Sequence, residues 1–185
     1  MALRPNLSFL TVSLLASTLA ARGVFAADGG QPPPGPPAAS VVTTLKDRQG
    51  RTVGTVTVTE TPHGLLVRGT VEGLPPGPHA IHFHETGKCE PPFASAGGHF
   101  NPAQKTHGVL SANGPHGGDL PNLIVPASGK LDFETFAPGL SLSTGPGAVF
   151  DADGTALVVH AKADDHVSQP AGDSGDRIAC GVLVR

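Results

Sequence analysis

Short segments in which apolar and polar residues alternate recur along the chain from about residue 40 onwards. Lys130–Phe136 shows the pattern clearly, because apolar residues alternate there with acidic or hydroxyl residues. Such alternation predicts a β-strand with one buried and one solvated face. The clearest segments of this kind are Val41–Lys46, Thr52–Thr59, Leu65–Val71, His79–His84, Lys130–Phe136, Ala156–Ala161 and Ile178–Val184.

The spacing of these segments predicts an all-β fold. Glycine and proline number 25 and 19, and no stretch of ten residues after Ala39 has helical periodicity. About seven or eight antiparallel strands in one domain indicate a β-sandwich or β-barrel. Two regions interrupt the rhythm of strands, Gly87–Leu123 and Asp164–Asp176. Loops of that length inside a compact domain are usually functional.

The amino-terminal region predicts export. Residues 1–26 combine the basic Arg4, an apolar run over residues 7–21 and a Val24-Phe25-Ala26 ending, which is typical of a signal peptide cleaved near Ala26/Ala27. The alternative is a membrane anchor, but the run is shorter than the roughly 20 residues that span a bilayer. We therefore expect no stable membrane anchor after cleavage.

A proline- and glycine-rich segment follows the predicted signal. Residues 27–39 have no apolar periodicity and are expected to form an extended linker, with a ligand for a proline-recognition domain as the alternative. The folded domain is then expected over residues 40–185.

Charge and cysteine content exclude several classes of protein. The formal net charge is −3 and there is no basic block, so no nucleic-acid partner is expected. Two cysteines are too few for a disulfide scaffold or a four-thiolate zinc site. In an exported chain Cys89 and Cys180 are expected to oxidise to each other, and two free thiols are the alternative.

Histidine is the unusual component of the composition. Six of the nine histidines fall between His79 and His116. Within the first long loop, His99, His107, His116 and Asp119 offer three imidazoles and one carboxylate, a set suited to a tetrahedral divalent ion and to zinc first. The alternative is a chance scatter of polar loop residues.

A second set of histidines lies on the predicted strands. Alternation places His82 and His84 on one strand face, where two imidazoles can converge on one ion. They could equally be two solvent-facing histidines. His160 ends an apolar strand and becomes a ligand candidate only if the others need a partner. His63 and His166 lie in turn-like contexts without a predicted role. His79 is expected either to support a metal ligand or to be structural.

Together these segments resemble the copper,zinc superoxide dismutases, and the bacterial secreted branch most. The resemblance covers residues 40–185 in order and rests on His79–Glu85, Gly97–Pro102, His107-Gly108, His116 with Gly118–Leu120, Val159–Ala161 and Gly175–Val182. It implies a Greek-key β-barrel of about eight antiparallel strands with two long functional loops, and a location in the periplasm.

The resemblance also implies a site, residue by residue. Copper (Cu²⁺/Cu⁺, one per chain) would bind His82, His84, His99 and His160, and zinc (Zn²⁺, one per chain) would bind His99, His107, His116 and Asp119. His99 would bridge both ions and exchange a proton in catalysis. Arg177 would guide the anionic substrate, Asp164 would link ligands of the two metals, and Cys89–Cys180 would form the disulfide.

The activity implied is the conversion of superoxide to dioxygen and hydrogen peroxide. A non-catalytic copper or zinc carrier on the same fold is the alternative. Ala80, Ile81 and Phe83 depart from the usual family residues, which affects the expected packing or subunit pairing but not the number of ligands. The sequence leaves open whether the chain forms a homodimer.

Overall fold

The computed structural model describes residues 38–184, and these residues form strands with one short 3-10 helix, Ala94–Ala96. The strands are β1 (Ser40–Asp47), β2 (Thr52–Thr61), β3 (Gly64–Glu72), β4 (Gly77–His79), β5 (Ile81–His84), β6 (Leu123–Val125), β7 (Lys130–Pro138), β8 (Thr155–His160) and β9 (Arg177–Leu183). This part of the chain contains no apolar helix with the length needed to span a bilayer.

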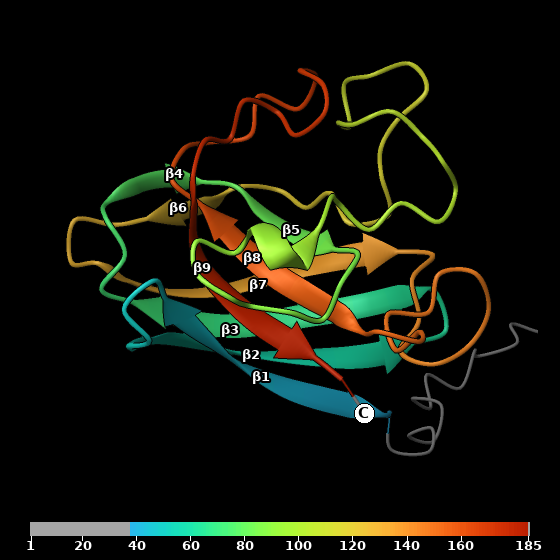
Figure 1. The fold of residues 1–185 in the computed structure, drawn as a ribbon, viewed down its shortest axis with the longest axis horizontal. Coiled ribbons are helices and arrows are strands. Elements are labelled where there is room, and N and C mark those ends of the chain that lie inside the picture. The colour runs from blue at the N-terminus through green and yellow to red at the C-terminus, as the bar shows by residue number, and fades with distance from the viewer. Residues whose placement is uncertain (1–37, 185) are drawn as a thin grey trace, which may run out of the picture. The chain divides into compact units, whose positions relative to one another are not determined.

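The strands form one large antiparallel sheet and one small ribbon (Figure 1). The large sheet has the order β5-β8-β9-β1-β2-β3-β7, and β4 pairs with β6. The ribbon is joined to both edges of the large sheet, because β4 continues into β5 and β6 leads through a turn into β7. The curled sheet confirms the predicted all-β Greek-key barrel.

The predicted alternation corresponds to real burial. On β7, Asp132 and Glu134 are exposed, whereas Leu131 and Phe133 pack against the core. The core inside the barrel includes Leu45 and Leu157, both fully buried. Removing such apolar side chains from water provides most of the stabilisation of a fold like this one.

The prediction of a single strand over His79–His84 is wrong. The chain forms two strands there, β4 in the ribbon and β5 in the large sheet, with Ala80 between them. The backbone of Ala80 donates to the Lys162 carbonyl and accepts from the His160 amide, at 2.8 and 2.9 Å. These bonds take Ala80 out of both ladders. The sequence also missed β6, which is too short for alternation to be detected.

The predicted signal peptide (1–26) and almost all of the linker (27–39) lie outside the described residues. Strand β1 begins at Ser40, where the domain was expected to start.

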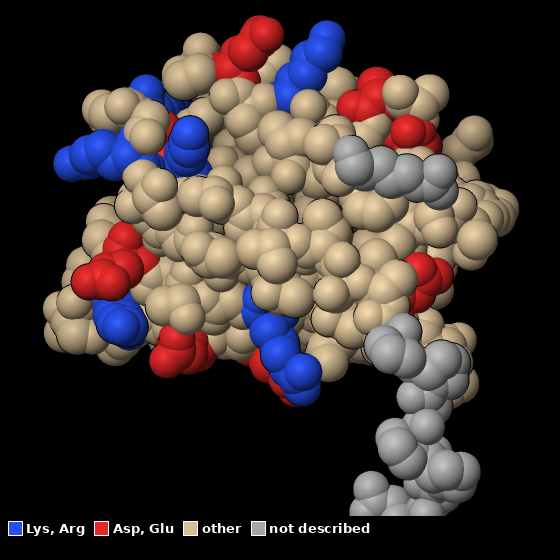
Figure 2. All heavy atoms as spheres, turned by 90° about the horizontal axis from the view of Figure 1, so that it is seen from below, with Lys and Arg blue, Asp and Glu red and all other residues tan. Residues whose placement is uncertain are grey.

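The later part of the first long loop and the second long loop lie on the same side of the barrel, at the top of Figure 1. The side on which β1 lies, seen in Figure 2, is mostly uncharged in its middle and carries Lys, Arg, Asp and Glu toward its rim. Most of the predicted metal ligands belong to the first of these loops and to the strands next to it.

Candidate metal centre

Three of the predicted histidines lie on the outer face of the strands β5 and β8. On β5, Ile81 and Phe83 point into the barrel core, so His82 and His84 point outward beneath the loops. His160 is the last residue of β8, where the register with β9 shifts. All three histidines are buried although they lie outside the barrel. The loops above them must therefore exclude water from this face.

The first long loop runs along the free edge of β5 and brings two further residues to it. An isolated bridge joins His84 to His99, and another joins His82 to Asp119. His99 and Asp119 are 20 positions apart in the loop, yet both lie beside outward-facing residues of the same strand. This pairing explains why strand and loop residues share one site.

A glycine permits the close contact between the loop and β5. The Phe83 amide donates to the Gly118 carbonyl at 2.9 Å, and the Phe83 carbonyl accepts from the Phe100 amide at 2.8 Å. A Cβ atom on Gly118 would lie 2.3 Å from the Phe83 carbonyl oxygen. Any larger residue at this position would push the loop, and with it Asp119, away from the strand.

The structure brings the predicted ligands together in two buried groups. In each, one ligand atom per residue lies within 4.8 Å of all the others. We call them the strand group (His82, His84, His99 and His160) and the loop group (His99, His107, His116 and Asp119). His99 belongs to both groups, and its imidazole therefore stands between them.

The loop group has the dimensions of a tetrahedral site. Asp119 Oδ1 lies 2.8, 3.1 and 3.4 Å from Nδ1 of His99, His107 and His116. Zinc–ligand bonds of about 2.0–2.1 Å at tetrahedral angles separate neighbouring ligand atoms by about 3.3 Å. The buried Nδ1 atoms of His107 and His116 have no hydrogen-bond partner, which is costly unless a cation occupies the centre.

In the strand group, backbone contacts determine which ring nitrogen is free. His84 Nδ1 donates to the Gly97 carbonyl at 3.0 Å. The proton of the neutral ring is therefore on Nδ1, and Nε2 has a free lone pair. His160 Nδ1 faces the Ser174 hydroxyl at 3.0 Å and the Gly175 carbonyl at 3.3 Å. The two Nε2 atoms then lie 3.4 Å apart, and two lone pairs at that distance favour a shared cation.

Asp164 connects the two groups. Its Oδ2 accepts from His82 Nε2 at 2.7 Å and its Oδ1 accepts from His107 Nε2 at 2.9 Å. These bonds leave Nδ1 of each ring free to face its own group, and both Nδ1 atoms are buried without a partner. The carboxylate thus fixes the tautomer and orientation of one ring in each group.

Burial sets the protonation states that metal binding requires. It lowers the pKa of His82 to about 4, of His84 to about 2 and of His160 to about 3. Burial would raise the pKa of Asp119, but hydrogen bonds from His99 and the Gly108 amide lower it to about 2. At neutral pH these imidazoles are therefore neutral and the carboxylate is ionised, as ligands must be.

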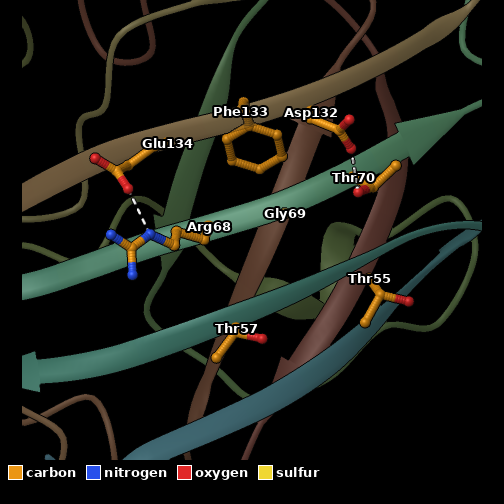
Figure 3. Close-up of a pocket in the computed structure, with 8 residues that line it drawn as sticks. All are labelled: Thr55, Thr57, Arg68, Gly69, Thr70, Asp132, Phe133 and Glu134. Carbon is orange, nitrogen blue, oxygen red and sulfur yellow. Dashed lines mark hydrogen bonds and ion pairs between the residues drawn. The ribbon is translucent and has the colours of Figure 1, made fainter.

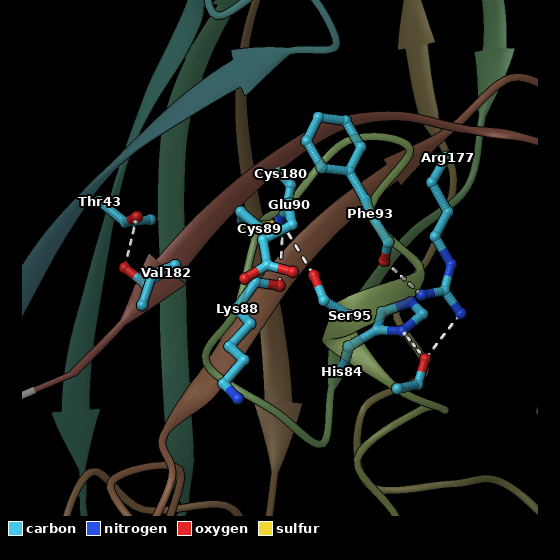
Figure 4. Close-up of a disulfide and its surroundings, with 11 residues drawn as sticks. Thr43, His84, Lys88, Cys89, Glu90, Phe93, Ser95, Arg177, Cys180 and Val182 are labelled. Carbon is cyan, nitrogen blue, oxygen red and sulfur yellow. Dashed lines mark hydrogen bonds between the residues drawn. A yellow bond between two sulfur atoms is a disulfide. The ribbon is translucent and has the colours of Figure 1, made fainter.

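Arg177 lies beside His84, a member of the strand group (Figure 4). Its Nη1 and Nη2 donate to the carbonyls of Phe93 and Gly97, both at 2.6 Å. The Gly97 carbonyl also accepts from His84. A surface pocket is lined by Arg177, His160 and the tip of the second loop. The guanidinium therefore holds the backbone of the first loop in place and also lines a pocket beside the strand group.

The predicted Cys89–Cys180 disulfide is confirmed, so the alternative of two free thiols is excluded. It ties the start of the first loop to β9, and Cys89 and Cys180 pack with Phe93 on the outer face of the sheet. Figure 4 shows the two cysteines with Phe93 and Arg177 in their surroundings. The disulfide thus fixes the segment whose carbonyls hold Arg177.

The remaining histidines lie outside both groups. His63 is exposed in a turn, and His79 is buried with its Nδ1 2.8 Å from the His160 carbonyl. His166 is adjacent to the site, because its amide donates to Asp164 Oδ1 at 2.6 Å. Both His79 and His166 thus support site residues, as expected for His79 but not for His166.

Two amide side chains at the site were not singled out from the sequence. Asn122 accepts from the Asp164 amide at 2.8 Å and donates to its carbonyl at 2.9 Å. Gln169 makes the corresponding pair of bonds with His107. Isolated amides in loops carry no pattern, so no sequence signal could have identified them.

A second hollow lies away from the site, on the outer face of β2, β3 and β7 (Figure 3). Its lining includes Gly69, Arg68 and Thr70 of β3. The charged and hydroxyl groups around it pair with one another, Arg68 with Glu134 and Thr70 with Asp132. The hollow therefore presents no set of converging unpaired charged groups.

Comparison with known proteins agrees with the geometry. Residues 52–183 match the family described as copper/zinc superoxide dismutase. The chain belongs to the copper/zinc superoxide dismutase family. It is 47% identical over 148 residues to the superoxide dismutase [Cu-Zn] of Caulobacter vibrioides, which covers 78% of this chain and 85% of that protein. Copper and zinc are the cofactors of this family, and the two histidine-rich groups suit them.

Two further relatives bear on the fold and the site. The chain is 41% identical to a superoxide dismutase-like protein of Bacillus subtilis, over 92% of this chain and 95% of that protein. The solved Cu/Zn superoxide dismutase of Brucella abortus has a TM-score of 0.66 and 31% identity, covering 78% of this chain and 99% of that one. Both agree with a copper/zinc superoxide dismutase fold over nearly the whole described domain.

Proposed function

We propose that the chain is an exported copper,zinc superoxide dismutase, which converts superoxide to dioxygen and hydrogen peroxide and protects the cell envelope. One observation carries the proposal: the His99 ring has Nδ1 in the loop group and Nε2, buried and unpartnered, in the strand group. A protein that only stored metal would not need one imidazole common to two sites. Every ligand position is also filled, so neither group is degenerate.

The strand group is assigned to copper. Four imidazoles without a carboxylate suit copper, whereas the three imidazoles and one carboxylate of the loop group suit zinc. When bound, copper supplies the one-electron chemistry by which superoxide is oxidised and reduced in turn. The protein holds the ligands with the hydrogen bonds already described, so little reorganisation is needed.

His99 is the residue assigned to proton transfer. Its Nδ1 is fixed toward Asp119, while its Nε2 faces the strand group. The ring can therefore accept a proton at Nε2 and return it to a reduced oxygen species without leaving its place. The loop group keeps the ring in position during this exchange.

Arg177 is assigned to attracting the substrate. The formal charge of the whole chain is −3, which repels an anion at long range. A guanidinium at about 5 Å contributes roughly 1–3 kcal/mol of attraction in an effective dielectric of 20–80. Its place in the pocket beside His160 supports this role.

Export to the periplasm is part of the same proposal. The disulfide supports an oxidising compartment. The signal-like pattern of residues 1–26 supports cleavage near Ala26/Ala27. Intact-mass measurement of the secreted protein should give a chain that starts near Ala27, and a mass that retains residues 1–26 would contradict cleavage.

Metal content and superoxide turnover, measured on one preparation, test the function. We expect one copper and one zinc per chain and rapid turnover. His99→Ala should lose turnover and weaken both metals. The matched control is His63→Ala, because His63 is an exposed histidine outside both groups. Full metal content without turnover would favour the non-catalytic carrier.

A further inference from the structure

The side-chain amide of Gln169 binds both backbone polar atoms of His107. Its Oε1 accepts from the His107 amide at 2.8 Å, and its Nε2 donates to the His107 carbonyl at 3.0 Å. A primary amide has one acceptor oxygen and two donor hydrogens, so one rotamer satisfies both bonds. The side chain thus acts toward His107 as a neighbouring β-strand would.

This contact joins the two long loops. Gln169 belongs to the Asp164–Asp176 loop and lies 62 residues from His107 in the sequence. The same loop contacts His107 a third time, because Asp164 accepts from its Nε2. Gly108 lies so close to this loop that a Cβ atom there would be 2.0 Å from the His166 carbonyl oxygen. His107 is therefore held on its ring and on its backbone by a segment other than its own.

Asn122 provides an internal comparison. It binds the amide and the carbonyl of Asp164 in the same way, but from the end of the first loop. Each loop therefore supplies one amide that holds the backbone of a site residue in the other loop. The two residues held in this way, Asp164 and His107, are themselves joined by a hydrogen bond between their side chains.

Gln169 also belongs to the wall of the pocket beside the strand group. That wall includes His160 and Arg177, together with Ser174 and Gly175, which contact the His160 ring. Gln169 thus binds a residue of the loop group with its side-chain amide and also lines the pocket beside the strand group. Displacing Gln169 from His107 would change both.

We propose that Gln169 is a positioning residue that holds His107 in the geometry zinc requires. The inference rests on the assignment of the loop group to zinc. Gln169 is exposed at the surface, so its replacement leaves no cavity. It removes the two hydrogen bonds to His107 and a third, from Gln169 Nε2 to the Val167 carbonyl. By contrast, His107 is completely buried.

Gln169→Ala and Gln169→Asn test the proposal, since the shorter Asn side chain cannot reach both His107 atoms. Val167→Ala is the matched control, because Val167 lies in the same loop with half of its surface exposed. In the metal-free protein, exchange of the His107 amide hydrogen should be about tenfold faster in both Gln169 variants than in wild type and control. Their melting temperature should fall by only about 2–4 °C, the shift that a tenfold change in opening implies for a domain of this size.

Zinc binding is measured by competition with a chelator. We expect the zinc dissociation constant to rise about 10–100-fold in both Gln169 variants and to stay constant in Val167→Ala. The visible absorption of Co²⁺ bound in place of zinc should also change, because that absorption reports the geometry of the ligands. Unchanged amide exchange and unchanged zinc affinity in Gln169→Ala would overturn the proposal. Failure of the wild-type protein to bind zinc would instead contradict the proposed function.

Discussion

The two ligand groups share one histidine but are built in different ways. The strand group takes three of its four members from β5 and β8, whose positions are fixed by ladder hydrogen bonds. The loop group lies entirely between His99 and Asp119, where no regular strand or helix is formed. Strand ligands are therefore positioned by the barrel before metal binds. Loop ligands depend on other loops and on the metal itself.

The hydrogen bonds to the ligand rings do not share this contrast, because both long loops orient rings of the strand group. The first loop orients His84 through the Gly97 carbonyl. The second loop orients His160 through the Ser174 hydroxyl and His82 through Asp164. Asp164 and Gln169 of the second loop also hold His107. Loss of order in the second loop should thus release rings in both groups, but only in the loop group should it also free the backbone of a ligand, that of His107.

The largest expected effect is that of acid on the metal-free protein. Unfolded histidine titrates near 6.5, whereas burial lowers the pKa of His82, His84 and His160 to about 4, 2 and 3. Between pH 6.5 and 4 the unfolded chain binds protons that the folded chain does not. The free energy of unfolding should fall by about 1.4 kcal/mol per pH unit for each such group.

Urea denaturation at a series of pH values checks this expectation, with the metal-loaded protein as control. The loss should begin as the pH falls below 6.5, and the metal-loaded protein should be the more stable of the two at every pH at which it keeps its metal. A constant stability of the metal-free protein between pH 7 and 5 would show that the strand histidines are not held neutral by the fold.

Removing the disulfide should have the next largest effect. Replacing Cys89 and Cys180 by serine frees a loop of 91 residues and should lower the free energy of unfolding by about 4–5 kcal/mol. It should also loosen the segment that holds Arg177 and His84, on the strand-group side. Denaturation of oxidised, reduced and double-serine protein gives the measurement. Equal stability of all three forms would contradict it.

Asp119→Ala should weaken metal binding by the loop group much more than metal binding by the strand group. It removes an oxygen that contacts three imidazoles, and a second oxygen that accepts from the amides of Gly108 and His116. Zinc affinity should fall by about 100-fold, or about 2.7 kcal/mol. Copper affinity should change far less. Asp119→Asn is the matched control for shape, and full zinc occupancy of Asp119→Ala under a competing chelator would contradict the assignment.

The smallest expected effect concerns Arg177. Replacement by alanine should lower turnover by about tenfold, in line with the roughly 1–3 kcal/mol of attraction, and replacement by glutamate should lower it further. Lysine keeps the charge but loses the forked donation to Phe93 and Gly97. Steady-state rates at full metal loading, measured against ionic strength, separate charge from structure because salt screens only the charge. Equal rates across the series would remove Arg177 from the mechanism.

The sequence by itself determined the strands and the chemistry of the ligands. Alternation is local, so it placed β1, β2, β3 and β7 to within two residues and put His82 and His84 on one face. The imidazoles and the carboxylate within 21 residues of loop already indicated a tetrahedral site. The division of His79–His84 into two strands was not predictable, because it depends on bonds from Ala80 to residues some 80 positions away.

Only the tertiary structure decided which nitrogen of each ring is free and what holds the loops together. The contacts of His82 with Asp164 and of His107 with Gln169 join residues 82 and 62 positions apart. Such pairs follow from how the loops pack on the sheet, and no spacing along the chain encodes them. Hydrophobic periodicity fixes where a strand lies, whereas side-chain orientation depends on partners that only folding brings within hydrogen-bond distance.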